Sequence, residues 1–304
     1  MQFEWGTMMQ IIIKDYDNTE EGQLKRLLDL AFEDDGLLNI IKDSKYKFAY
    51  SAVAGNNVLA VIFGWESNFH PYCIYFRILS HPFYEMYRLE EKLLSYVKKV
   101  EDFDKPLQTS IWESAIHCKK IYERNGFKEI RRTFMPTLQL ADVKEGFQIN
   151  EKNDRIKTLE EISSNSELMQ KLTLLVKRNY EETHRVNPVV DAQVDEWQRL
   201  ILANDTVMKG SYIILDPVED EVMAYSFLHE SDNTNVYELG WCGCSEKQYK
   251  RLIPQLISKH IKHSIRQGIS AIVGEFDTTD YCAMEVLKTF PFEPYPTWIT
   301  YQKN

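Results

Sequence analysis

Two hydrophobic periods alternate along this chain, and each change of period marks a new element. Continuous or alternating apolar runs rich in β-branched and aromatic residues predict strands, whereas apolar residues three or four apart predict helices. The first half follows the order strand, helix, hairpin, strand, helix, strand, helix, strand. These segments are expected at residues 11–16, 18–34, 48–65, 73–82, 83–100, 107–112, 113–125 and 134–140.

The second half repeats this pattern of helices, hairpin and strands. Its segments are expected at residues 166–184, 211–228, 235–244, 250–268, 271–276, 280–290 and 297–303. Pro82 and Glu246 precede matching helices, and the spacing between them recurs almost unchanged between the later elements of the two halves. A nearly constant offset predicts two copies of one α/β unit. We therefore expect domains at residues 1–142 and 143–304, joined by the polar stretch at 141–155.

Composition narrows the class of protein. The chain has 304 residues, of which 44% are hydrophobic and 27% charged, as in globular proteins large enough for two domains. Its net charge of −10 argues against a nucleic-acid partner. No apolar run reaches membrane-spanning length, and the first residues lack the features of a signal peptide. Five scattered cysteines suggest a reducing compartment, so we expect a cytoplasmic protein.

Two pairs of residues could suggest a metal site, but neither has enough partners. Cys242 and Cys244 form a Cys-x-Cys pair on a predicted strand, without two further ligands at suitable spacing. They are read as small apolar strand residues. His260 and His263 lie about one helical turn apart, and no third ligand is evident. No metal is expected.

The stretch "KKIYERNGFKEI" at residues 119–130 carries the most specific pattern in the chain. It places a tyrosine near the end of a helix, before a glycine and a phenylalanine. With the element order of each half, this resembles a tandem Gcn5-related N-acetyltransferase (GNAT), whose motif there is Asn-x-x-Ala-x-x-x-Tyr-x-x-x-Gly-Phe. The motif falls on Ala115, Cys118, Tyr122, Gly126 and Phe127 in the first half, and on Asp280, Ala283, Leu287, Pro291 and Phe292 in the second.

The resemblance implies a fold, a cofactor and a role for Tyr122. It implies two acyl-CoA N-acyltransferase domains, each a mixed α/β sheet whose central strands part to admit acetyl-CoA. In such enzymes an amine attacks the thioester, and the tyrosine of this helix protonates the leaving thiolate, which would be Tyr122 here. The alternative is that the ring of Tyr122 packs in the core while its hydroxyl reaches water.

The family's pyrophosphate loop is altered in both halves. Its pattern is Arg/Gln-x-x-Gly-x-Gly/Ala, and neither residues 85–90 nor 249–254 contain glycine. The first copy places Glu85 and Glu90 where phosphates would lie, which is electrostatically unfavourable. The second copy is the better candidate because it offers two cations, with a proline suited to an early helical position. The cofactor-binding residues expected there are Tyr249, Lys250, Arg251, Leu252, Ile253 and Pro254.

Further roles follow from the resemblance on the strand at 235–244. The backbone of Cys242, Gly243 and Cys244 would hold the pantetheine arm. Glu238 lies where family members often carry a general base, whereas the first-half equivalent is Ile74. The alternative is that Glu238 is an ordinary exposed or paired strand carboxylate. The first half thus keeps a tyrosine acid without a base, and the second a candidate base without the tyrosine.

We therefore expect an enzyme that moves an acetyl group to a primary amine of a small molecule or peptide by direct attack. A protein that has lost catalysis and serves as a binding or scaffolding module is the alternative, because both loops lack glycine. A longer acyl donor also remains open. The acidic charge favours a cationic acceptor. His184 and the Asn187-Pro188 pair either line the acceptor site or simply end a helix.

Overall fold

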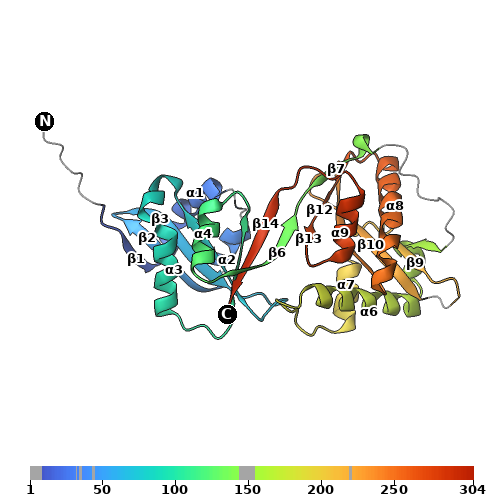
Figure 1. The fold of residues 1–304 in the computed structure, drawn as a ribbon, viewed down its shortest axis with the longest axis horizontal. Helices are drawn as coiled ribbons and strands as arrows, with labels where there is room; N and C mark the ends of the chain where they lie inside the picture. Colours follow the sequence, from blue (N-terminus) through green and yellow to red (C-terminus); the bar gives the residue numbers. More distant parts are fainter. Residues whose placement is uncertain (1–8, 32, 34–35, 43–44, 144–154, 219–220) are drawn as a thin grey trace. The chain divides into compact units, whose positions relative to one another are not determined.

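The structure is a computed structural model that describes residues 9–31, 33, 36–42, 45–143, 155–218 and 221–304. It divides into two compact units (Figure 1). Unit 1 comprises residues 1–129 and 300–304, and unit 2 comprises residues 130–299. The last residues of the chain therefore belong to the first unit. Most of the predicted linker at 141–155 lies outside the described residues, and the boundary at 142/143 stays a prediction.

Unit 1 is built on antiparallel strands that continue into one parallel pair. Their order in the sheet is β1-β2-β3-β4-β5, followed by β14. The predicted hairpin at 48–65 is confirmed, with a turn at Gly55, whose φ of +57° suits a residue without a side chain. The strands are β1 (Ile12–Asp15), β2 (Tyr46–Ala54), β3 (Asn57–Trp65), β4 (Ile74–Ser80), β5 (Leu107–Trp112) and the part of β14 (Thr297–Lys303) from residue 300 on.

Helices cover both faces of this sheet. α1 and α2 pack on the face that carries Val61, Phe63 and Leu79. These residues share a face because alternate residues of a strand point to the same side of the sheet. α3 covers the opposite face, where Tyr96 contacts Tyr50 edge-on. The helical elements are η1 (Asn18–Glu20), α1 (Glu21–Ala31), α2 (Gly36–Lys42), η2 (Pro82–Tyr87), α3 (Leu89–Val100) and α4 (Ile116–Arg124).

Unit 2 repeats the arrangement with a six-stranded sheet in the order β7-β12-β11-β10-β9-β8. β13 pairs with β6 in an antiparallel ladder beside it. The strands are β6 (Lys128–Phe134), β7 (Thr137–Gln139), β8 (Ile156–Thr158), β9 (Tyr212–Leu215), β10 (Val222–Glu230), β11 (Val236–Cys244), β12 (Ala271–Gly274) and β13 (Phe276–Asp277).

The helices of unit 2 again lie on two faces. α8 and α9 bury an aliphatic stripe against Leu228, Cys242 and Cys244. On the opposite face α6 and α7 carry Tyr180 and Trp197, which pack on Trp241. The helical elements are η3 (Leu140–Asp142), α5 (Leu159–Ser163), α6 (Ser166–Thr183), α7 (Val194–Ile201), η4 (Lys247–Leu252), α8 (Ile253–Arg266) and α9 (Tyr281–Thr289).

Two predicted helices differ from the prediction in the same way. The helix predicted at 83–100 begins as the 3-10 segment η2, and Arg88 separates it from α3 in the left-handed region at φ 51°. The helix predicted at 250–268 likewise begins inside the 3-10 segment η4, and Pro254 occupies the first turn of α8. A change of helix type between a strand and a helix leaves no mark in hydrophobic periodicity, because both carry apolar residues every three or four positions.

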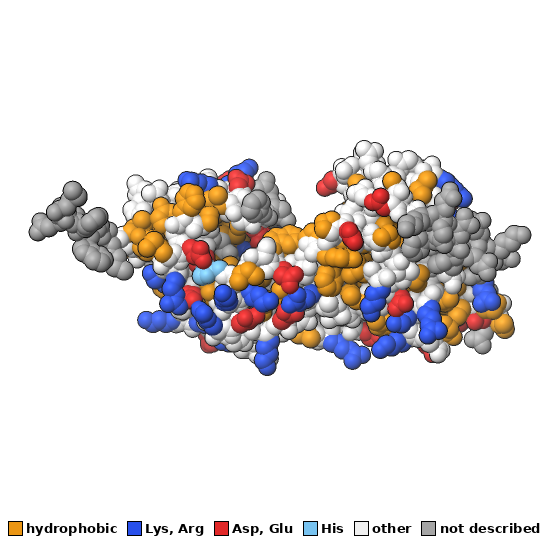
Figure 2. Space-filling model, turned by 45° about the horizontal axis from the view of Figure 1, so that its top comes forward, with side chains coloured by type: hydrophobic (Ala, Val, Ile, Leu, Met, Phe, Trp, Pro, Cys, Tyr) orange, Lys and Arg blue, Asp and Glu red, His pale blue; other side chains and the backbone are white. Residues whose placement is uncertain are grey.

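Surface charge of both signs is mixed over the described part of the face in Figure 2, where Lys and Arg side chains lie among Asp and Glu. No helix in the described part of the chain combines the length and the apolar character that a bilayer crossing requires.

Candidate functional site

The central strands of each unit pair only at their beginnings and then part. In unit 2, β11 and β12 run parallel from Val236 opposite Ala271 to Leu239 opposite Gly274, and β11 continues beyond this pairing to Cys244 along β10. In unit 1, the parallel pairing of β4 with β5 ends at Tyr75. Tyr75 and Leu239 are the same number of residues apart as Pro82 and Glu246, which precede matching helices. The central strands therefore part at equivalent positions in the two units. The expected parting of the central strands is therefore confirmed in both units.

The free edge of β11 presents backbone groups of Cys242 and Cys244. The Ser245 N–H donates to the Met223 carbonyl at 2.8 Å, which fixes which residues of β11 bond to β10. Backbone groups alternate sides in an antiparallel ladder, so those of Cys242 and Cys244 point away from β10, toward the side that β12 has left. Asn179 of α6 donates from Nδ2 to the Cys244 carbonyl at 3.2 Å. This edge can hydrogen-bond an extended ligand.

The side chains of these cysteines face the opposite way from α6 and are not available at that edge. Cys242 and Cys244 are buried in the core beneath α8 and α9, where the Sγ atoms of Cys244 and Cys282 lie 3.5 Å apart. Burial raises the pKa of the Cys242 thiol well above its usual value. Gly243 between them has no room for a side chain, since a Cβ there would lie 2.6 Å from the Tyr225 hydroxyl.

A β-bulge lies beside the parting of the strands. The register between β10 and β11 shifts between Ser226 and Leu228, so β11 carries an extra residue there. We call the side of the unit 2 sheet that α6 covers the α6 face. A Cβ at Gly240 would meet the His229 ring at 2.4 Å, which places Gly240 on the α6 face, where Gly243 also lies. Trp241 joins them on that face, where it packs against Tyr180. The bulge thus turns Trp241 toward α6.

Three carboxylates gather on the α6 face near this point. Glu238 is exposed and lies directly opposite His229 on β10 and Val273 on β12. Glu275 and Asp277 follow β12. The side chain of Glu275 is exposed, as that of Glu238 is. Partial loss of hydration nevertheless raises the pKa of Glu275, and the charges of Asp277 and Glu238 raise it further. The exposure of Glu238 agrees with the alternative of an exposed strand carboxylate, and its role as a general base stays a prediction.

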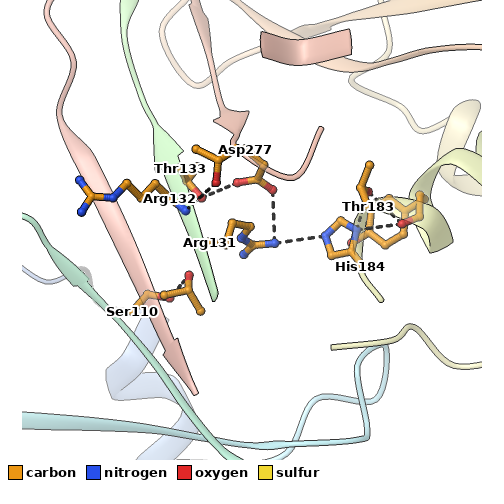
Figure 3. Close-up of polar contacts among 10 residues, drawn as sticks. Ser110, Arg131, Arg132, Thr133, Thr183, His184 and Asp277 are labelled. Atoms are coloured by element: carbon orange, nitrogen blue, oxygen red, sulfur yellow. Dashed lines mark hydrogen bonds and ion pairs between the residues drawn. The ribbon is translucent and has the colours of Figure 1, made fainter. Parts of the chain in front are cut away.

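Arg131 of β6 ties one of these carboxylates to α6 (Figure 3). Its Nη1 lies 3.2 Å from Asp277 Oδ2 and 3.3 Å from His184 Nε2. The Thr133 hydroxyl donates to the other oxygen of Asp277. His184 follows the last residue of α6, and its ring stacks on Tyr180 with centroids 4.0 Å apart. His184 thus ends a helix, as one of the two alternatives predicted, and its place in the acceptor site stays a prediction.

Cations surround the start of α8 in unit 2. Lys250 pairs with Glu285 at 2.9 Å, and Arg251 is exposed. Arg178 donates to the Ser245 carbonyl at 2.7 Å, and Lys247 lies over the Tyr281 ring. The apolar members of this segment pack toward the core of unit 2, and their role in cofactor binding stays a prediction. Tyr249 and Leu252 pack partly buried against the core, whereas Ile253 and Pro254 are buried.

The equivalent region of unit 1 carries carboxylates instead. Glu90, in the first turn of α3, is 6% exposed and accepts a hydrogen bond from the Ser80 hydroxyl at the end of β4. His117 lies 3.4 Å from Glu85 and 3.7 Å from Glu90. The guanidinium of Arg88 pairs with Glu91. A buried carboxylate of the chain thus lies in the first turn of this helix, where its charge would repel an anionic ligand at the backbone amides.

Tyr122 lies inside the core of unit 1. It is 1% exposed and packs against the rings of Phe76, Phe127 and Tyr301. Burial raises the pKa of its hydroxyl, and Cys118 adds to this. The ring position matches the core alternative, although the hydroxyl does not reach water. Its role as an acid stays a prediction. Glu238 belongs to unit 2, so the two predicted catalytic residues lie in different units.

No group of three or more His, Cys, Asp or Glu side chains that could hold a metal ion occurs among the described residues. His260 is fully buried and uses both ring nitrogens within the protein, whereas His263 of the same helix is partly exposed.

Several residues near the parting of the strands were missed from the sequence. Glu275, Asp277 and Arg131 come from segments far from Glu238 in the chain, and no motif marks them. Asn179 lies within a helix predicted only as an amphipathic element. One signal was available for Glu275, because a charged residue directly after the apolar run of residues 271–274 indicates a change of environment.

The fold is that of the tandem GNAT acetyltransferases. A GCN5-related N-acetyltransferase from Sphaerobacter thermophilus superimposes with a TM-score of 0.63 at 12% identity, covering 96% of this chain and 95% of that one. A tandem GNAT protein from the clavulanic acid biosynthesis pathway, solved without acetyl-CoA, gives 0.57 at 13%, covering 97% and 98%. A GNAT acetyltransferase from Colwellia psychrerythraea gives 0.54 at 12%, covering 96% and 98%. No protein-family model and no curated protein matches the sequence.

Proposed function

We propose that the chain is an N-acyltransferase in which unit 2 transfers an acetyl group from acetyl-CoA to a primary amine of a small molecule or peptide. One observation carries the proposal. β11 and β12 part after Leu239, which leaves the backbone of Cys242 and Cys244 facing the side that β12 has left, with Glu238 and Glu275 on the α6 face nearby. Backbone donors and a proton acceptor are what direct attack of an amine on a thioester requires.

The residues of unit 2 fit acetyl-CoA in two respects. The edge at Cys242 to Cys244 can hydrogen-bond the amides of the pantetheine arm. The segment at 249–254 brings Lys250 and Arg251 to a helix start, where a pyrophosphate is favoured by cations and by backbone N–H groups. When bound, acetyl-CoA supplies an activated acyl group on a thiol that can leave near neutral pH, since thiols of this kind have a pKa of about 8.5.

The chain's own residues then serve binding and proton transfer. Glu238 is the carboxylate expected from the sequence to take a proton from the acceptor. Tyr180 and Trp241 pack against each other on the same side of the sheet. Leu287 stands where the family has its tyrosine, so protonation of the sulfur would come from the nucleophile or from solvent in this unit. All five cysteines are free, as in proteins of a reducing cytoplasm, where we place this one.

A second function, binding without catalysis, is favoured for unit 1. Glu90 occupies the start of α3, and Tyr122 is sealed in the core. An anionic cofactor would have to displace a buried carboxylate there, which is costly. Unit 1 would then support the fold and contribute surface. Phe83 and Met86 of η2 are 86% and 81% exposed on that unit.

Calorimetry with acetyl-CoA tests this assignment. Lys250→Glu should weaken binding by at least about tenfold, which corresponds to roughly 1.4 kcal/mol. Arg88→Glu is the matched control, because it also replaces a cation by an anion at the corresponding helix start, here in unit 1. Each variant removes one ion pair with a glutamate, Lys250 with Glu285 and Arg88 with Glu91. Arg88→Glu should leave the affinity unchanged. If the wild type does not bind acetyl-CoA at millimolar concentration, the proposed enzymatic function is refuted. If only Arg88→Glu weakens acetyl-CoA binding, the cofactor site lies in unit 1 instead.

A further inference from the structure

We propose that Glu275 is the proton acceptor for the incoming amine, an inference that rests on the proposed acetyl transfer in unit 2. Gly274 is the last residue of β12 that pairs with β11, and Glu275 follows it directly. Glu275 is therefore the first residue of this segment beyond the paired part of the sheet. Glu238 lies one residue inside the paired part, with a strand on either side of it.

Glu275 shares a face with the groups that surround the predicted acceptor side. Val273 lies opposite Glu238, so their side chains point to the same side of the sheet, and Glu275 follows Val273 by two residues. Gly274 between them points the other way, since a Cβ there would meet Phe276 and Leu239 in the core beneath α8. Alternation thus directs Glu275 to the α6 face.

The carboxylates on this face differ in what holds them. Asp277 is engaged at both oxygens, by the Thr133 hydroxyl and by the Arg131 guanidinium (Figure 3). Within the described part of the chain, no hydrogen bond or ion pair engages the carboxylate of Glu275. A general base must have an oxygen open to the proton that it accepts. Asp277 is therefore excluded as the base, which leaves Glu275 and Glu238.

The titratable side chains around Glu275 come from four strands and one helix. Glu238 of β11 and Asp277 of β13 are negative neighbours, and Arg131 of β6 is positive. His229 of β10 lies across from Glu238, and Tyr180 of α6 lies near Arg131. Reduced hydration is the largest cause of the raised pKa of Glu275, followed by the charge of Asp277. A carboxylate with a raised pKa is a stronger base and better matched to an ammonium donor.

The step conserves atoms and charge. An ammonium N–H bond of the acceptor breaks, and its proton passes to a carboxylate oxygen of Glu275. The freed nitrogen lone pair forms the C–N bond to the acyl carbon while the C–S bond breaks with its electrons on sulfur. The second proton of the nitrogen goes to that sulfur, which gives an amide and a thiol. Glu275 then releases its proton to water.

A pair of nucleophiles separates proton removal from the rest of catalysis. Methylamine and spermidine are protonated at neutral pH and need a base, whereas hydroxylamine is already unprotonated. After subtraction of the uncatalysed reaction, Glu275→Gln should lower transfer to the protonated amines by about 10²-fold or more. Transfer to hydroxylamine should stay within a few-fold of the wild type. Glu230→Gln, an exposed carboxylate at the end of β10, is the control and should behave as the wild type.

Each outcome decides. Equal loss of transfer to all nucleophiles, or loss by Glu238→Gln while Glu275→Gln stays active, overturns the assignment. A wild type that transfers to none of them overturns the proposed function as well. Carbon NMR of labelled glutamate carboxyls gives a readout without turnover. The signal that disappears in Glu275→Gln should titrate above the usual value of about 4.3, and titration at or below that value also overturns the inference.

Discussion

His260 gives unit 2 a pH-dependent stability whose size follows from the structure. The side chain is 0% exposed. Its Nδ1 faces the Gly210 carbonyl at 2.5 Å, so this nitrogen carries the proton and donates it, and Nε2 accepts from the Ser226 hydroxyl at 2.9 Å. The neutral ring is therefore fully bonded. Burial lowers the pKa of His260 to about 3, since a charged imidazole would be desolvated.

The sign and size of the effect follow from proton binding. Below the unfolded pKa of about 6.5 the unfolded chain binds a proton at His260 that the folded chain refuses, so stability is lost as pH falls from that value toward the folded pKa. The loss attributable to this residue is about 2 kcal/mol at pH 5 and about 4 kcal/mol at pH 3.

The measurement is urea unfolding of unit 2 at pH 7.5 and pH 5. Tryptophan fluorescence reports this unit once the tryptophans of unit 1, Trp5, Trp65 and Trp112, are replaced by Phe. In that background, the chain with His260 should lose about 2 kcal/mol more between the two pH values than its His260→Gln variant. His263→Gln, a change on the same helix at a partly exposed site, should keep the larger part of the dependence, because partial burial also lowers the pKa of His263. If the decrease in the free energy of unfolding between pH 7.5 and pH 5 is the same for His260→Gln and its parent to within about 0.5 kcal/mol, the inference that His260 is buried as a neutral ring is refuted.

Two further substitutions test the packing of unit 2 and the role of Tyr122. Gly243→Ala should destabilise unit 2 by about 1–3 kcal/mol, because the new Cβ would lie 2.3 Å from Asn179 and 2.6 Å from Tyr225. Thermal unfolding measures this. Gly22→Ala in α1, where nothing lies within 4 Å of the new Cβ, is the control and should be neutral or stabilising. Tyr122→Phe should leave acetyl transfer within about twofold, whereas a loss of about 10²-fold would restore its role as an acid.

The duplication was visible in the sequence and carries into hydrogen bonds. The Ser245 N–H bonds to Met223, and the His81 N–H bonds to Leu59, each at 2.8 Å. The two donors, His81 and Ser245, are as far apart in the sequence as Pro82 and Glu246, and so are the two acceptors, Leu59 and Met223. An offset between apolar patterns could predict this because repeated patterns bury the same faces and so impose the same strand register.

The candidate site was only partly predictable. The strand that carries Glu238 and Cys242 was identified, because its apolar run and its place in the element order are local properties. The sequence left open whether Glu238 is exposed, since exposure depends on which helices cover the strand. Glu275 was missed because its significance depends on where the pairing of β11 with β12 ends, and pairing between segments separated by a whole helix leaves no local mark.

The sequence by itself determined the order of elements, their repetition and the loss of glycine at both helix starts, because each of these is set by residues a few positions apart. Only the tertiary structure decided that the last residues of the chain belong to unit 1, that Glu90 fills the helix start of α3, and that Arg131 joins Asp277 to His184. These are contacts between distant segments, and they follow from how whole faces are buried rather than from any local pattern.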